Sequence, residues 1–235
     1  MANGRWRLPN GKHFEIQRFF SATAFRCSTF KIEKMSQKSP AEHQAIVDFL
    51  NEIGGDDSNY NAIYNSLSLP SKRTFNRVDK YIQNTHSPKH DQYTMKLVKL
   101  FEIDHPRDTR YRPVDGERCM LLFHGTEKQY VYSILNEGLR YTLASEFGLF
   151  GQGIYTTDCA SKAANFTCSN PMKYDGTADQ GIIWPEKKYG YMFLCQVATG
   201  LCSTYNGKPK SKDTDYLLED NQGRRYNSVM GIGKY

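Results

Sequence analysis

The stretch Leu122–Thr126 (LFHGT) places an imidazole and a glycine at the end of a short apolar run that begins at Met120. Two further stretches follow, Gly151–Tyr155 (GQGIY) and Ser161–Phe166 (SKAANF). A glycine lets a ligand approach the backbone closely, and aromatic faces attract cationic groups. Each stretch is common by itself. Their order and spacing indicate one pocket for a flat, positively charged ring, built where a strand runs into a loop.

Helical signals lie on both sides of this region. Ser39-Pro40 and Glu42 form an N-cap, a proline at the first helical position and a capping box, so a helix is predicted to Ile53 with Gly54-Gly55 as its end. Apolar spacing predicts further helices over 72–84, around 131–135 with Gly138 as its end, and over 159–166.

Strand patterns are mixed with these helices. Alternation predicts a long strand over 93–103, and apolar runs predict strands over 120–123, 152–156 and 191–198. Residues 56–70 are predicted to be a connector, and 203–225 a long surface loop. Because helices and strands do not alternate regularly, the predicted fold class is α+β, not a doubly wound sheet.

Composition narrows the function classes. A chain of 235 residues fits one large domain or a domain with an appendage. No stretch approaches the roughly 18 apolar residues of a membrane span, so we expect no membrane partner. The six cysteines contain no C-x-x-C pair, which predicts no metal site and reduced thiols in a nuclear or cytoplasmic protein.

The net charge of +6 is concentrated at the N-terminus. Residues 1–35 hold seven Lys and Arg against two Glu, so +5 of the total lies there. A basic arm can contact phosphates or act as an organelle presequence. We expect instead that residues 1–35 form a basic, disordered extension.

Several segments, taken in order, resemble the catalytic domain of poly(ADP-ribose) polymerases, particularly the DNA-damage-responsive branch. They are Phe75–Val78, Tyr81–His86, the predicted strand to Ile103, the three stretches above, and Asn227–Lys234. The resemblance covers about residues 59–235, and residues 36–58 resemble the end of the regulatory helical domain of that branch. It implies an ADP-ribosyltransferase-like fold, with a split mixed and antiparallel β-sheet, flanking short helices and a preceding helical segment.

The resemblance also implies a reaction and its site. NAD would be the substrate, ADP-ribose would pass to protein or nucleic-acid acceptors, and nicotinamide would be released. Gly125 would pair with the nicotinamide amide, His124 would donate to a ribose hydroxyl, and Tyr155 and Phe166 would lie against the ring. The implied catalytic residues are His124, Tyr155 and Lys162; the implied NAD-binding residues are His124, Gly125, Thr126, Arg140, Gly153, Tyr155, Ala163 and Phe166. The resemblance further implies that the protein is nuclear, or alternatively cytoplasmic, and that it has a role in DNA repair. It also implies that any dependence on DNA would act through upstream domains that are absent from this sequence.

The sequence departs from the family's pattern in four places. Ala163 replaces a serine that bonds the nicotinamide amide, Tyr130 replaces a small polar residue, and the loop 141–149 is short. The family's catalytic glutamate follows the Gly-x-Gly-Lys segment, and no residue of this sequence matches it. Asp213, Asp215, Glu219 and Asp220 all precede that segment. We therefore expect a C-terminally truncated chain with poor polymerase activity.

Other interpretations remain open at this point. The chain can be a catalytically inactive NAD-binding or interaction module. An NAD-dependent oxidoreductase is disfavoured because G-x-G-x-x-G is absent. His124 can cap a strand, Tyr155 and Phe166 can be core aromatics, and Lys162 and Arg140 can be ordinary solvated side chains.

Overall fold

A computed structural model describes a large part of the chain. The described residues are 38–55, 58–90, 94–104, 119–145, 148–167, 190–206 and 220–232, together with the backbone of 14–19. The rest of the predicted basic extension, and the acidic residues Asp213, Asp215 and Glu219, lie outside the described residues.

The elements follow one another along the chain in a mixed order. The helices are α1 (Pro40–Ile53), α2 (Tyr60–Ser66), α3 (Lys72–Asn84), α4 (Lys128–Glu137) and α5 (Ala160–Ala164), with single 3-10 turns at Pro88–His90 and Tyr141–Leu143. The strands are β1 (Phe14–Phe19), β2 (Leu67–Ser68), β3 (Glu102–Ile103), β4 (Cys119–Thr126), β5 (Thr156–Thr157), β6 (Tyr191–Ala198), β7 (Cys202–Asn206) and β8 (Ser228–Ile232). Within the described ranges, none of the helices has the length and hydrophobicity needed to cross a bilayer.

The ends of α1 are those predicted from the sequence, and α3 has a cap that was not predicted. Ser39 Oγ accepts a hydrogen bond from the Glu42 N–H at 3.2 Å, and Gly54 ends α1 in the left-handed conformation at φ 82°. Ser71 Oγ caps α3 in the same way through the Thr74 N–H at 3.1 Å. The predicted helices over 40–53 and 72–84 are therefore confirmed, because their capping side chains are local to the sequence.

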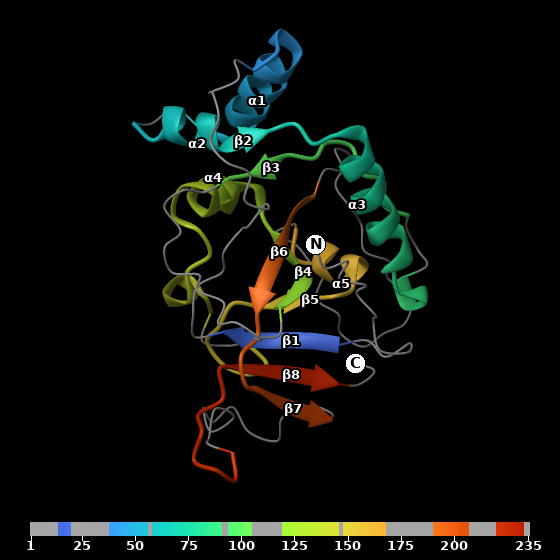
Figure 1. Ribbon diagram of the computed structural model, residues 1–235, viewed down its shortest axis with the longest axis vertical. Helices are drawn as coiled ribbons and strands as arrows, with labels where there is room; N and C mark the ends of the chain where they lie inside the picture. The colour runs from blue at the N-terminus through green and yellow to red at the C-terminus, as the bar shows by residue number, and fades with distance from the viewer. Residues whose placement is uncertain are drawn as a thin grey trace, which may run out of the picture.

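One sheet of six strands runs through the molecule in the order β6-β4-β5-β1-β8-β7 (Figure 1). β4 and β6 form an antiparallel ladder of eight consecutive pairs, from Cys119↔Ala198 to Thr126↔Tyr191. β7 and β8 pair in parallel, and β2 and β3 form a separate two-stranded sheet. The α+β class with a mixed sheet is confirmed.

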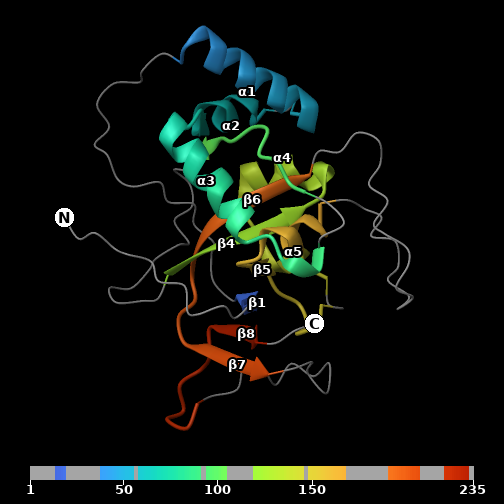
Figure 2. The ribbon, with the colours of Figure 1, turned by 90° about the vertical axis from the view of Figure 1, so that its right-hand side faces the viewer.

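Helices cover both faces of the β4–β6 ladder (Figure 2). Leu122 of β4, with Phe193 and Cys195 of β6, packs into a core shared with α1, α2 and α4. The alternate residue Phe123 packs on the opposite face, with Ala163 of α5. Because side chains alternate along a strand, each face of β4 belongs to a different helical layer.

Several predicted boundaries are wrong. Of the predicted strand over 93–103, only β3 pairs with another strand among the described residues, because its partner β2 is two residues long. The predicted connector over 56–70 contains α2 and β2. The predicted strand over 152–156 is displaced to β5 (Thr156–Thr157), and the predicted loop over 203–225 begins inside β7. His124 lies within β4 instead of at its end, since β6 continues the ladder to Thr126.

β1 is also unexpected, because its residues belong to the segment predicted to be disordered. Its sequence FEIQRF alternates apolar and polar residues at the start, but the pattern is too short to stand out in a basic segment. β1 pairs antiparallel with β5 on one side and with β8 on the other. It therefore joins what we call the β4–β6 half of the sheet (β4, β5 and β6) to the β7–β8 half (β7 and β8).

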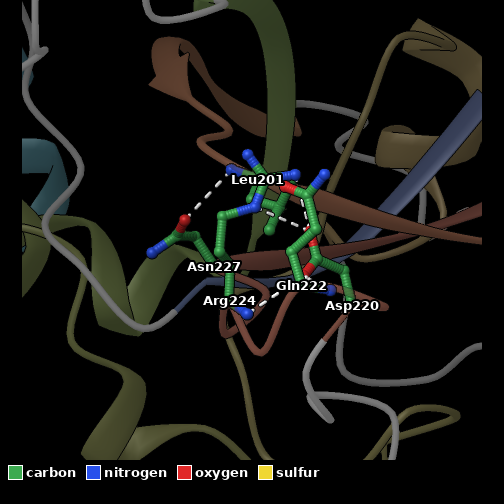
Figure 3. A network of polar contacts seen from close by, with 5 residues as sticks. All are labelled: Leu201, Asp220, Gln222, Arg224 and Asn227. Carbon is green, nitrogen blue, oxygen red and sulfur yellow. Dashed lines mark hydrogen bonds and ion pairs between the residues drawn. The ribbon is translucent and has the colours of Figure 1, made fainter.

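A polar clasp holds the start of β8 against the turn that follows β6 (Figure 3). The Asn227 side-chain oxygen accepts from the Leu201 N–H at 3.0 Å, and the Asn227 N–H donates to the Leu201 carbonyl at 2.7 Å. Nearby, the Asp220 carboxylate accepts from the backbone N–H groups of Gln222 and Arg224, both at 2.9 Å. The guanidinium of Arg224 also bonds Asp220 and holds the pKa of that carboxyl below its usual value.

Candidate functional site

A small cavity of about 90 Å³ lies where β4, β5 and α5 meet. Its lining residues are Phe123, His124, Gly125, Tyr155, Thr156, Thr157, Lys162, Ala163 and Phe166. All three stretches singled out in the sequence contribute to it. Pockets that enclose a whole drug-sized ligand measure roughly 300–1,000 Å³, so this cavity matches one ring of a ligand.

Three predicted site residues do not line the cavity. Thr126 is buried at the end of β4, opposite Tyr191 of β6. Gly153 precedes the buried Ile154, and Arg140 forms an ion pair with Glu137 at the end of α4. Their predicted roles in binding therefore stay predictions.

His124 is held by the backbone through one ring nitrogen. Its Nδ1 lies 2.8 Å from the Tyr155 carbonyl, and because a carbonyl only accepts, Nδ1 carries the proton. Burial lowers the pKa of the ring, which keeps it neutral. The other nitrogen, Nε2, is then an acceptor. The predicted donation to a ribose hydroxyl would need the proton on Nε2, and that role stays a prediction.

Gly125 allows α5 to lie directly on β4. A Cβ atom at this position would stand 1.9 Å from the Ala163 carbonyl oxygen and 2.8 Å from its carbon. No side chain fits in that space. The glycine is therefore required for packing as well as for the close approach of a ligand.

Tyr155 and Phe166 differ in how firmly the surrounding protein holds their rings. The Tyr155 hydroxyl donates to the Gly151 carbonyl at 2.7 Å and accepts from the Phe150 N–H at 3.0 Å, which fixes the ring against the preceding loop. Phe166 is 56% exposed, so it is not a core aromatic. An exposed ring beside a cavity of ring size is suited to stacking.

Thr156 contributes a buried hydroxyl group to the cavity wall. It is 4% exposed, and its Oγ1 has no hydrogen-bond partner among the described residues. The neighbouring Thr157 Oγ1 accepts from the Cys159 N–H at 3.1 Å. A buried hydroxyl without a partner costs about 1–3 kcal/mol, and bound ligand or water commonly satisfies such groups.

The roles of two positioning residues were missed from the sequence. Ser161 is fully buried, and its Oγ accepts from the Ser87 N–H at 2.8 Å and bonds His90 Nδ1 at 2.8 Å. Tyr81 of α3 stacks on Phe123 with ring centroids 5.1 Å apart and donates to the Leu121 carbonyl at 2.9 Å. Burial, with a smaller effect of Asp158, raises the Tyr81 pKa to about 12. Both residues brace the cavity wall through partners distant in sequence, so the stretches Tyr81–His86 and Ser161–Phe166 contained them without showing their roles.

A larger groove of about 360 Å³ lies elsewhere, between α1, α3 and residues 98–101. Its lining is apolar apart from Lys72 and Lys99 and contains no imidazole, thiol or carboxyl group. The imidazole, the hydroxyl groups and the exposed aromatic ring line the smaller cavity, which we take as the functional site.

The fold is α+β, and its small cavity is lined by an imidazole, a glycine and aromatic rings. Comparison with known families makes this specific. The model of the "Poly(ADP-ribose) polymerase catalytic domain" matches residues 72–234. The chain belongs to this family.

Individual relatives agree with the family match. Human poly [ADP-ribose] polymerase 2 is 33% identical over 164 residues, which is 68% of this chain and 24% of that protein. Chicken (Gallus gallus) poly [ADP-ribose] polymerase 1 is 32% identical over 185 residues, 76% of this chain and 16% of that protein. The chain therefore spans no more than about a quarter of the length of these relatives.

Proposed function

We propose that the chain binds NAD at the cavity and transfers ADP-ribose from it to an acceptor, with release of nicotinamide. The observation that carries this proposal is the convergence of six predicted site residues on one ring-sized cavity. They are His124, Gly125, Tyr155, Lys162, Ala163 and Phe166.

The cavity would hold the nicotinamide ring. Phe166 would stack on the cationic ring, a contact worth about 0.5–2 kcal/mol, and His124 Nε2 would accept from a ribose hydroxyl. Ala163, which is 1% exposed, offers only a methyl group where the family has a serine. One hydrogen bond of about 0.5–1.5 kcal/mol is then absent. The unpartnered Thr156 hydroxyl is a group of the cavity wall that a polar ligand can satisfy.

The wider assignment follows from the family. We propose an ADP-ribosyltransferase-like split sheet over residues 59–235, preceded by a regulatory-type helical segment at 36–58. Protein acceptors, a nuclear location, or alternatively a cytoplasmic one, and DNA dependence through upstream domains belong to the same proposal.

Substitution of Phe166 tests the pocket. Phe166→Ala should weaken NAD binding about 2- to 30-fold, the equivalent of the stacking energy, as measured by calorimetry. Tyr130→Ala is the matched control, because Tyr130 is also a half-exposed aromatic but lies on α4 and does not line the cavity. Equal affinities in the wild type and Phe166→Ala would contradict the pocket assignment.

Labelled NAD then separates two functions. A transferase labels protein and releases nicotinamide, whereas an inactive NAD-binding module binds without release. The second function is favoured by one observation: none of the described residues that line the cavity carries a carboxylate.

A further inference from the structure

The groove between α1, α3 and residues 98–101 shares no described lining residue with the cavity. It measures about 360 Å³, and the apolar side chains of Ala45, Phe75 and Leu100 lie in its lining. Leu69 and Val98, which also line it, are 41% and 54% exposed. Neighbouring apolar side chains that stay exposed on a folded domain mark a place where another molecule binds.

The walls of this groove are held by contacts within the protein. The ring of Phe101 stacks on Phe49 of α1, with ring centroids 4.6 Å apart. The Leu69 N–H donates to the Glu42 carboxylate of α1 at 2.9 Å, and the Ser71 hydroxyl caps α3 on the other wall. Because the walls are ordered before a ligand arrives, binding costs the protein little conformational entropy.

The charged groups of the groove are positive. Lys72 and Lys99 line it, and the described lining contains no carboxylate. α3 begins at Lys72 and has no acidic residue in its first turn, so its own sequence does not neutralise the positive end of the helix. The neighbouring Glu42 accepts from the Leu69 N–H. A ligand that complements this groove therefore combines apolar groups with negative charge.

The backbone along one side of the groove is open to pairing. β3 begins only at Glu102, and no strand of the described chain pairs with residues 98–100. Among the described residues, the backbone groups of Val98, Lys99 and Leu100 have no hydrogen-bond partner. An unpaired backbone segment beside an apolar groove can accept a strand from another polypeptide, whose main chain supplies the hydrogen bonds and whose side chains enter the groove. An extended peptide fits this arrangement.

We propose that the groove binds an extended segment of a partner protein in which large apolar side chains stand next to Asp or Glu. The apolar side chains contact Leu69, Phe75 and Val98, and the carboxylates face Lys72 and Lys99. This interaction is separate from NAD binding, because none of these residues lines the cavity.

Selection from a displayed library of random short peptides on the immobilised full chain tests the proposal. Peptides that carry Leu, Ile or Phe beside Asp or Glu should be enriched. Fluorescently labelled copies of the selected peptides are then titrated with the full chain, and binding is measured by anisotropy. Affinity should fall at least about 10-fold in the double variant Lys72→Glu, Lys99→Glu, because two attractive charge contacts become repulsive. It should also fall with added salt.

Matched variants separate the contributions of charge and apolar contact. Lys80→Glu, Lys128→Glu makes the same change in net charge at two exposed lysines outside the groove, and it should bind like the wild type. Val98→Ser removes a half-exposed apolar side chain and should weaken binding about 3-fold or more. A selected peptide with its acidic residues replaced by lysine should bind Lys72→Glu, Lys99→Glu better than it binds the wild type.

Three results would overturn the proposal. If no peptide is enriched, or if the enriched peptides lack acidic residues, the groove does not select this chemistry. Equal binding to the charge-reversed variant and to its control would place the peptide elsewhere on the surface. Self-association of the full chain that Val98→Ser abolishes, measured by sedimentation velocity, would assign the groove to a second copy of the chain. The proposed function is tested separately, by NAD binding at the cavity.

Discussion

The two halves of the main sheet are stabilised in different ways. In the β4–β6 half, eight consecutive pairs join β4 and β6, and helices cover both faces. In the β7–β8 half, five parallel pairs join the strands, and the buried apolar residues form a small cluster around Phe150 and Val229. The cavity belongs to the first half. The site lies where packing holds the backbone from both sides. The second half is attached through β1, the clasp, the Ser228 hydroxyl and the packing of Met230 against the larger core.

The largest expected effect comes from breaking β1. Ile16 pairs with Thr156 on one side and Met230 on the other, so Ile16→Pro removes a ladder hydrogen bond from an interior strand. The unpaired backbone group costs about 1–3 kcal/mol. Amide exchange in β8 should accelerate about 5-fold or more, while exchange in β4 and β6 stays close to the wild type. Ile16→Val, which keeps the N–H, should change neither half; equal acceleration in both halves would show that they unfold as one unit.

The next effect is confined to the β4–β6 half. Gly125→Ala forces a methyl group onto the Ala163 carbonyl and should displace α5 from β4. Overpacking of this kind costs about 1–3 kcal/mol, and NAD binding should be lost because α5 carries one wall of the cavity. Gly54→Ala is the matched control: its φ of 82° is strained for alanine but nothing lies within 4 Å of the added carbon. It should lower stability and leave NAD affinity unchanged, and retention of NAD binding by Gly125→Ala would refute the proposed packing role.

The smallest effect concerns pH and His124. Burial depresses the pKa of this ring in the folded protein below 6.5. Its contribution to stability is therefore complete above about pH 6.5 and is lost as the pH falls toward the folded pKa, with a slope of at most about 1.4 kcal/mol per pH unit. Urea unfolding between pH 5 and 8 should show a flatter acid slope for His124→Gln than for the wild type. Parallel slopes would mean that the imidazole is protonated equally in the folded and unfolded states.

The elements predicted best from the sequence are those whose capping residues or apolar pattern lie within the element itself. The cap at Ser39 predicted α1, the apolar spacing over 72–84 predicted α3, and the apolar run at Tyr191–Ala198 coincides with β6. Strands that depend on distant partners were less predictable. The alternating pattern before Glu102 has no ladder among the described residues, whereas β1 has two partners and almost no pattern.

The same distinction applies to the site. The three sequence stretches contain six predicted residues that line the cavity, because the residues that each stretch contributes lie close together in the sequence. Thr156 was missed because only the surrounding structure shows that its hydroxyl is buried and has no hydrogen-bond partner in the part of the chain that the structure describes. Ser161 was missed because its partners Ser87 and His90 come from the segment after α3. Arg140, which was predicted to bind NAD, forms an ion pair with Glu137 outside the cavity lining, and its predicted role stays a prediction.

The position of β1 has a consequence for biosynthesis. Its residues leave the ribosome early, yet they pair with Thr156 and Thr157 more than 130 residues later and with β8 near residue 230. Until those strands have been synthesised, β1 has no neighbour in the sheet. Pairing over such a long sequence separation slows folding and leaves aggregation-prone segments exposed. Both sides of β1 can therefore be paired only after β8 has been translated.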